Sequence, residues 1–151
     1  MNEVQSAIEK LRGKFVAGWS NHIDVDEGWY ALIIACDAAL TAIDPGYQIF
    51  QIKEKFGGLR YYVQASDPAL VRPLQDTIGR FEKVAARTCE ATGEPGILMR
   101  SVGGRLRTLN PDYAAGTLHF AGYKVVNVVQ SIPLPDPNAP DSDRDGLVID
   151  G

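Results

Sequence analysis

Cations and a glycine pair occur together in the segment QIKEKFGGLRYY, which spans residues 51–62. Its basic and glycine members are Lys53, Lys55, Gly57, Gly58 and Arg60. In a strand, Lys53 and Lys55 lie on one face, because side chains alternate with a period of two residues. Glycine lets the backbone approach a ligand closely, and cations around such a turn can bind a phosphate or a carboxylate. The segment therefore predicts an anion-binding or partner-binding surface; the alternative is a charged, solvent-exposed strand face in which Glu54 pairs locally.

A second basic group surrounds a further glycine pair and consists of Arg100, Arg105 and Arg107. Arg105 and Arg107 share a face if this segment is also a strand. Two basic hairpins, at residues 53–60 and 100–107, could form one surface for nucleic acid or nucleotides, and the sequence leaves open whether they are neighbours. The aromatic residues of the first hairpin are Phe56, Tyr61 and Tyr62. Their rings could stack on bases or pack within a sheet.

The sequence contains no complete catalytic or metal-binding set. His22 and His119 lie far apart, and neither has a cysteine, histidine or glutamate nearby at ligand spacing. There is no nucleophile elbow, no Walker phosphate-binding loop and no HExxH motif. We therefore predict that the protein is not an enzyme. The alternative is an unrecognised active site that uses Lys53, Glu54 or Tyr62.

The negative charge of the chain is concentrated at one end. Of 151 residues, 15 are Lys or Arg and 19 are Asp or Glu, which gives a net charge of −4. Residues 131–151 hold five aspartates and one arginine, so this segment carries the whole excess and residues 1–130 are balanced. A balanced body argues against a protein that coats nucleic acid, since that function needs a clear basic excess. Prolines precede the aspartates, so we expect 131–151 to be a flexible tail.

Part of this acidic segment resembles a calcium site. Asp141, Asp143 and Asp145, followed by Gly146, match the opening of an EF-hand-type loop. The twelfth position, which supplies a bidentate carboxylate, would fall at 152, beyond residue 151. We therefore predict a solubilising or partner-binding acidic tail, with calcium binding as the alternative.

The elements that must position the basic segments follow from the apolar pattern. Apolar residues recur every three or four positions, which predicts helices over residues 4–15, 29–43 and 70–85. Runs of β-branched and aromatic residues predict strands at 47–56, 59–64, 97–100, 106–109, 117–120 and 123–130, with a turn at 110–112. The expected fold class is α+β, with three helices and β-hairpins that form a small antiparallel sheet in a single domain at residues 1–130. Trp29 is expected in the core, with the aromatic edge of the basic surface as the alternative, and Cys36 is expected as a buried thiol.

Several motifs resemble a group of uncharacterised small proteins of bacteria and their phages. The matching segments are EGWY at residues 27–30, QIKEKFGGLRYY at 51–62, TCE at 88–90 and GRLRTL at 104–109. The resemblance spans residues 27–113 and implies a small zinc knuckle of the form CxxC…CxxH. This sequence keeps Cys89 but has Thr92, Asn110 and Tyr113 at the other three ligand positions. One ligand of four cannot hold a structural zinc ion, so we expect no zinc, and either packing around Tyr113 and Leu109 in its place or a rebuilt C-terminal part.

These observations together predict a non-enzymatic binding or regulatory protein of phage or mobile-element type that docks on a protein partner, as an inhibitor or immunity factor would. Binding of nucleic acid or nucleotides is the second hypothesis, and an unrecognised enzyme is the third. The longest apolar run, residues 31–36, is too short for a membrane span, and the first residues do not resemble a secretory signal. Two cysteines are too few for a disulfide framework. We expect a cytoplasmic protein without a resident cofactor, and the oligomeric state stays open.

Overall fold

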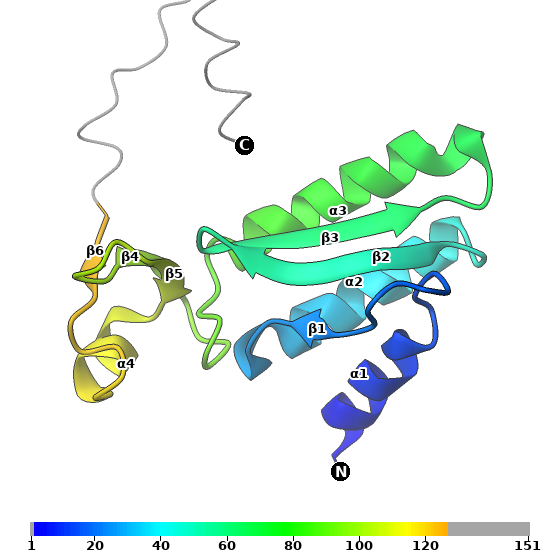
Figure 1. The fold of residues 1–151 in the computed structure, drawn as a ribbon. Helices are drawn as coiled ribbons and strands as arrows, with labels where there is room; N and C mark the ends of the chain where they lie inside the picture. The colour runs from blue at the N-terminus through cyan, green and yellow to red at the C-terminus, as the bar shows by residue number, and fades with distance from the viewer. Residues whose placement is uncertain (1, 127–151) are drawn as a thin grey trace, which may run out of the picture.

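A computed structural model describes residues 2–126 and shows the α+β fold that the sequence predicts (Figure 1). The helices are α1 (Glu3–Arg12), η1 (Glu27–Trp29), α2 (Tyr30–Ile43), η2 (Pro68–Leu70), α3 (Val71–Ala85) and α4 (Pro111–Gly116), where η denotes a short 3-10 helix. The strands are β1 (Ile23–Asp24), β2 (Gln48–Lys55), β3 (Gly58–Gln64), β4 (Ile97–Arg100), β5 (Leu106–Leu109) and β6 (Lys124–Val125). None of the helices within residues 2–126 is long and apolar enough to cross a membrane.

Helices α1 and α3 begin where their sequences provide caps. Asn2 caps α1, since its side-chain oxygen accepts the Gln5 N–H at 2.8 Å. Asp67 caps η2 through the Ala69 N–H at 2.9 Å, and η2 continues directly into α3. Pro73 lies in the first turn of α3, where a missing backbone donor disrupts a helix least. The helix predicted for this region therefore tolerates its proline.

The hairpin of β2 and β3 is the centre of the first sheet. The strand order is β1-β2-β3, with β2 and β3 antiparallel and β1 parallel to β2. The parallel strand departs from the antiparallel sheet that we predicted. Strand β1 can lie parallel to β2 because the connection between them is long and contains α2. Parallel neighbours need a crossover connection of this kind. Helices α2 and α3 lie behind β2 and β3, and no helix or strand within residues 2–126 covers the opposite face of the sheet (Figure 1).

The second sheet has the order β5-β4-β6 and lies beside the tip of the β2-β3 hairpin (Figure 1). Two predictions in this region are wrong. Residues 117–120 do not form a strand but a turn, in which the Phe120 N–H donates to the Thr117 carbonyl at 3.0 Å. Residues 110–112 do not form a simple turn, because Asn110 accepts the Tyr113 N–H at 3.0 Å and caps α4. In both places a local hydrogen bond decides the backbone conformation, and the apolar pattern does not report it.

Two hydrophobic clusters stabilise the described residues. The larger cluster lies between helices α1, α2 and α3 and the first sheet, and it buries Trp29 and Cys36 completely, as predicted. The smaller cluster lies between the second sheet and α4, and its buried members are Cys89, Met99, Leu109, Ala114 and Phe120. The chain passes from one cluster to the other just before Cys89, so the two must be held together by contacts across this junction.

Some predictions concern residues outside 2–126. Of the strand predicted at 123–130, the described part contains only β6. The predicted tail at 131–151, with the calcium candidates Asp141, Asp143 and Asp145, lies outside the described residues.

Asp44 connects the end of α2 to the segment that follows β3. Its carboxylate accepts hydrogen bonds from the Ser66 hydroxyl at 2.6 Å, the Ser66 N–H at 2.8 Å and the Gly46 N–H at 3.1 Å. The hydroxyl and backbone donors of Ser66 lower the pKa of Asp44, because they stabilise the ionised carboxylate. This carboxylate therefore stabilises the fold above its unfolded pKa of about 4, and the contribution is lost as the pH falls through the lower folded value.

We expect Asp44→Asn to lower the free energy of unfolding at pH 7, with a deficit that narrows as the pH falls below about 4, where the parent carboxylate also takes up a proton. Urea denaturation at pH 7 and pH 3 measures both values. Asp76→Asn is the matched control, because Asp76 is exposed and forms no hydrogen bond within residues 2–126. A deficit of equal size at both pH values would contradict this role of Asp44.

Candidate functional site

The turn between β2 and β3 is a two-residue turn made by Phe56 and Gly57. Lys55 pairs with Gly58, and both central residues have positive φ, 53° at Phe56 and 81° at Gly57, as a type I′ turn requires. The Gly57 N–H donates to the Glu54 carboxylate at 2.7 Å. A Cβ atom at Gly57 would lie 2.6 Å from the end of the Leu98 side chain, which would have to move, and the positive φ itself favours glycine. Gly57 therefore has a packing role, and its N–H is not available to an anion because it already donates to Glu54.

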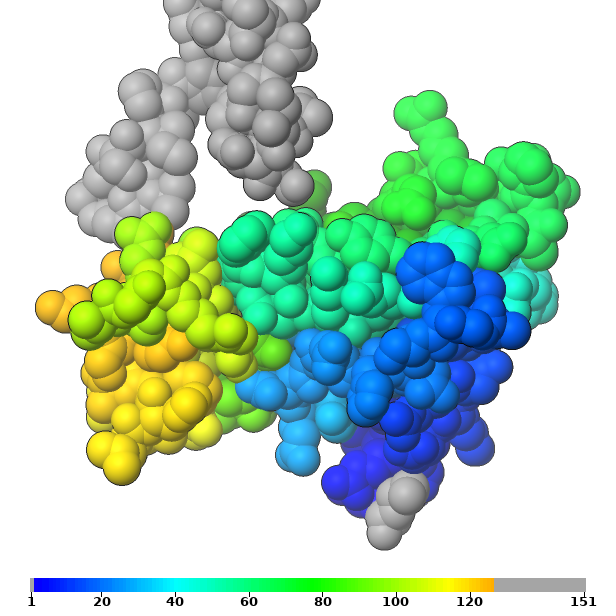
Figure 2. Space-filling model, viewed as in Figure 1, coloured from blue at the N-terminus to red at the C-terminus, as the bar shows by residue number. Residues whose placement is uncertain are grey.

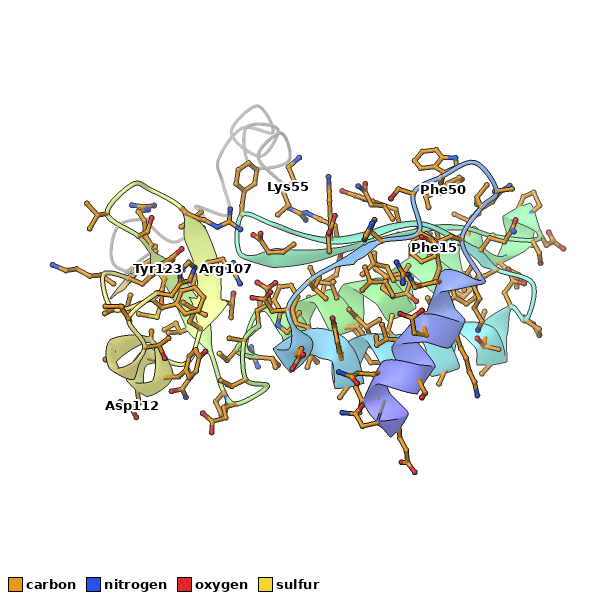
Figure 3. All side chains as sticks on the ribbon, turned by 60° about the horizontal axis from the view of Figure 1, so that its bottom comes forward. Phe15, Phe50, Lys55, Arg107, Asp112 and Tyr123 are labelled. Atoms are coloured by element: carbon orange, nitrogen blue, oxygen red, sulfur yellow. The ribbon has the colours of Figure 1, made fainter. Side chains whose placement is uncertain are left out.

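The open face of the first sheet carries the predicted cations Lys53, Lys55 and Arg60. Lys53 lies directly opposite Arg60 in the register of β2 and β3, and Lys55 follows Lys53 on the same face. Figure 3 shows Lys55 and Phe50 projecting from the side of the sheet away from α2 and α3. Within residues 2–126 none of the three cations forms an ion pair. Like charges directly opposite each other destabilise a sheet, although Lys53 also has Asp24 of β1 as its neighbour on the other side, and Arg60 lies near enough to Glu82 to offset part of the rise that burial causes in the pKa of that carboxyl.

Exposed aromatic rings lie on the same face and at its tip. Tyr62 is 45% exposed and lies two residues beyond Arg60, and Phe56 is 65% exposed at the turn. The Lys55 ammonium group lies 5.5 Å from the centre of the Phe56 ring. At the other end, Trp19 is 54% exposed and packs on Phe50, with 4.8 Å between the ring centres. Figure 2 shows the surface of the hairpin uncovered between the N-terminal segment and the second sheet.

The second sheet adds cations beside this face. Leu98 contacts Gly57 and therefore faces the β2-β3 turn. Arg100 is two residues from Leu98 in β4, so it projects from the same side of the second sheet, and it lies opposite Lys124 of β6. Both are exposed and form no ion pair within the described chain. We call Lys53, Lys55, Arg60, Arg100 and Lys124 the basic face.

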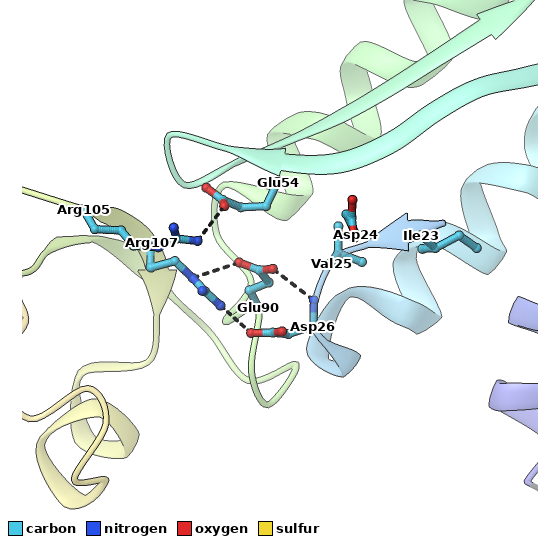
Figure 4. Close-up of a pocket in the computed structure, with 8 residues that line it drawn as sticks. All are labelled: Ile23, Asp24, Val25, Asp26, Glu54, Glu90, Arg105 and Arg107. Carbon is cyan, nitrogen blue, oxygen red and sulfur yellow. Dashed lines mark hydrogen bonds and ion pairs between the residues drawn. The ribbon is translucent and has the colours of Figure 1, made fainter. Parts of the chain in front are cut away.

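Arg105 and Arg107, which the sequence grouped with these cations, belong to a different place. They line a polar cleft of about 260 Å³ between β1, the end of β2 and β5 (Figure 4). The residues that line the cleft are Ile23, Asp24, Val25, Asp26, Glu54, Glu90, Arg105 and Arg107. The two predicted basic hairpins are thus neighbours, since the Thr108 hydroxyl donates to the Gly57 carbonyl at 2.7 Å. Their arginines 105 and 107, however, are matched by carboxylates.

Arg107 is the centre of a buried ion network in this cleft. Its guanidinium donates a hydrogen bond to Asp26, and its Nε lies 3.2 Å from Glu90 Oε1 (Figure 4). The other Glu90 oxygen accepts the Asp26 N–H at 3.0 Å. Arg105 lies at the rim and pairs with Glu54 at 3.2 Å. Contacts from three distant segments therefore close the junction between the two hydrophobic clusters.

Burial acts in opposite directions on the pKa values of Glu90 and Arg107. Burial raises the pKa of Glu90, and the Asp26 N–H and Arg107 offset only part of the rise. Burial also tends to lower the pKa of Arg107, but attraction by Glu90 and Asp26 outweighs it and raises the pKa. The network therefore holds a permanently charged guanidinium and a carboxylate that is costly to ionise.

The positions expected for zinc ligands serve other purposes. Cys89 is buried in the smaller hydrophobic cluster, against which Tyr113 packs. The Thr92 hydroxyl accepts the Glu94 N–H at 3.2 Å, and Asn110 caps α4. Within residues 2–126 no group of three or more His, Cys, Asp or Glu side chains could hold a metal ion.

Sequence reasoning missed Asp26 and Glu90 as partners of Arg107, because no spacing rule relates residues so far apart. The one signal was the resemblance itself, since its four segments meet at this junction. The Trp29 ring nitrogen donates to the Thr88 carbonyl at 2.8 Å, and a side chain at Gly28 would strike the backbone of Cys89 and Glu90. The residues of these motifs thus relate more directly to the junction between the two hydrophobic clusters than to a binding site.

Comparison with protein-family models, curated proteins and solved structures finds no match for this chain. The resemblance to the bacterial and phage group therefore stays a prediction, and a function must be inferred from the geometry.

We expect Arg107→Met to lower the free energy of unfolding by about 3 kcal/mol at pH 7, because it leaves Glu90 buried without its counter-charge. The deficit should shrink as the pH falls, since the raised pKa of Glu90 lets the carboxyl become neutral in the fold at a higher pH than in the unfolded chain. Denaturant titration from pH 7 downward provides the measurement. Arg105→Met is the control: its exposed ion pair predicts a loss below about 1 kcal/mol. Equal losses in both variants would argue against a central role for Arg107.

Proposed function

We propose that the chain is a non-enzymatic binding protein that docks a single-stranded nucleic acid on the open face of β2 and β3. One observation carries the proposal. Lys53 and Arg60 lie directly opposite each other on a face that also exposes Tyr62, and neither cation forms an ion pair in the described chain. A phosphate backbone neutralises cations in this arrangement, and bases stack on exposed rings.

A single strand fits this face better than a duplex does. Stacking requires bases that are free of their partners, and the exposed rings of Tyr62 and Phe56 lie at the two ends of the row of cations. The balanced charge of residues 1–130 also disfavours strong attraction to duplex DNA, which is driven mainly by phosphate contacts. The partner thus uses a small basic face together with stacking.

The protein partner favoured by the sequence remains a prediction. An acidic protein segment would also meet Lys53, Lys55 and Arg60, but it would gain less from exposed rings than bases do. The dependence of binding on the rings therefore separates the two partner classes.

We expect Lys53→Gln combined with Lys55→Gln to weaken binding of a fluorescent single-stranded oligonucleotide. The slope of log affinity against log salt should fall by about 1.4, which corresponds to about 0.7 for each phosphate that is no longer neutralised. Fluorescence anisotropy at several salt concentrations measures both. The matched control combines Lys10→Gln and Lys83→Gln, which removes equal charge from exposed positions on α1 and α3. The same slope in both double variants, or no binding by the parent chain, would rule out this face.

We expect Phe56→Asn to stabilise the fold and weaken oligonucleotide binding at the same time. Asparagine tolerates positive φ far better than phenylalanine, so the free energy of unfolding should rise by about 0.5–1 kcal/mol. Removal of a stacking ring should weaken binding about tenfold, within the usual range for one base. Thermal unfolding and anisotropy measure the two effects. Unchanged affinity in a more stable variant would show that Phe56 does not contact the ligand.

A further inference from the structure

The polar cleft between the two sheets adjoins the basic face, since its rim residue Asp24 lies beside Lys53, but it has chemistry that the proposed function does not use. Four carboxylates and two guanidinium groups line its volume of about 260 Å³, which leaves a formal excess of two negative charges. This volume is close to the lower end of ligand pockets, about 300 Å³. The cleft is thus large enough for a small polar molecule and has the wrong sign for an anion.

Glu90 presents an acceptor that the fold leaves without a hydrogen bond. Its side chain is only 3% exposed, and its Oε1 has no hydrogen-bond partner within residues 2–126. Arg107 Nε lies 3.2 Å away, but its N–H does not point along a hydrogen bond to that oxygen, and it too lacks a partner in the described chain. Buried polar atoms are almost always hydrogen-bonded, so an N–H donor in the cleft would complete this site once the Glu90 side chain turns its buried oxygen toward the cleft.

Asp24 supplies a second acceptor at the rim. Its side chain is exposed in β1, lies beside Lys53 in the register of β1 and β2, and forms no hydrogen bond or ion pair in the part of the chain that the structure describes. The other carboxylates are engaged, Asp26 by Arg107 and Glu54 by Arg105. The cleft therefore offers a buried carboxylate oxygen at its wall and a free carboxylate at its mouth.

From this arrangement we infer that the cleft binds a small organic cation, an alkylguanidinium or alkylammonium group. Such a group carries a positive charge and several N–H donors, which match the charge excess and the acceptors on Glu90 and Asp24. Arg107 already shows this mode of recognition, because Asp26 and Glu90 hold its own guanidinium at the wall of the cleft. The cation can be a free molecule or the side chain of an arginine or lysine in a peptide.

The test titrates the full chain with butylguanidinium, butylammonium and the peptide acetyl-Gly-Arg-Gly-amide. The Nε–H resonance of Arg107 in nitrogen–proton NMR spectra reports on the wall of the cleft, and its absence from Arg107→Lys assigns it. Saturable shifts of this resonance are expected, and Asp24→Asn should raise the dissociation constant about fivefold, as removal of a charged partner does. Tighter binding of the peptide than of butylguanidinium assigns the site to a peptide side chain, and equal binding assigns it to a free cation.

The matched control is Asp76→Asn, which removes an exposed carboxylate on α3, far along the chain from the residues of the cleft. This variant should bind all three probes as the parent chain does, and thermal unfolding checks that both variants are folded. Failure of any probe to shift the Arg107 resonance to saturation would overturn the inference, as would equal losses of affinity in the two aspartate variants. Neither result depends on whether the basic face binds nucleic acid.

Discussion

Arg107 lies where the two hydrophobic clusters meet, and its guanidinium must remain charged although little of it reaches solvent. Asp26, from the segment that leads into α2, and Glu90, from the segment after α3, supply the opposing charges. The backbone of the same residue supports Gly57, so the turn of the main hairpin is seated on β5. A buried charge tolerates little displacement of its partners, because a partner that moves away leaves a desolvated ion behind. Together with the hydrogen bonds from Trp29 to Thr88 and from Thr108 to Gly57, the Arg107 side chain fixes the relative position of the two sheets.

The alternation of side chains along β2 separates structural from binding roles. Glu54 lies on the cleft side, where it accepts the Gly57 N–H and pairs with Arg105. Its neighbours Lys53 and Lys55 project to the open face, where Asp24 of β1 lies beside Lys53 but neither lysine forms an ion pair within residues 2–126. A strand of period two can thus tie the hairpin to the second sheet with one residue and present cations with the next. Residues 53–55, Lys-Glu-Lys, can therefore serve both the junction and the open face because they form part of a strand.

Local patterns were sufficient for most elements of the first sheet and its helices. Apolar spacing located α1, α2 and α3, and the glycine pair located the hairpin, because both signals lie within a few residues. The same reasoning placed Arg107 on a binding surface, since nothing in the sequence around residue 107 indicates that the carboxylates at positions 26 and 90 pair with it. It also missed α4, whose cap on Asn110 is a single side-chain hydrogen bond. Long-range charge pairing and isolated caps lie outside what periodicity can report.

Two features of the hairpin oppose stability and lie next to each other. Lys53 and Arg60 repel across the strands, and Phe56 holds a backbone conformation that bulky residues avoid. A single substitution would relieve either feature: a carboxylate in place of one of the two opposed cations, or an asparagine in place of Phe56. Neither substitution would disturb the packing of Gly57. Departures from local rules that the fold does not require are most common at functional sites. Because both departures face the open side of the sheet and neither faces the cleft, the physical case for a binding function is strongest on that face.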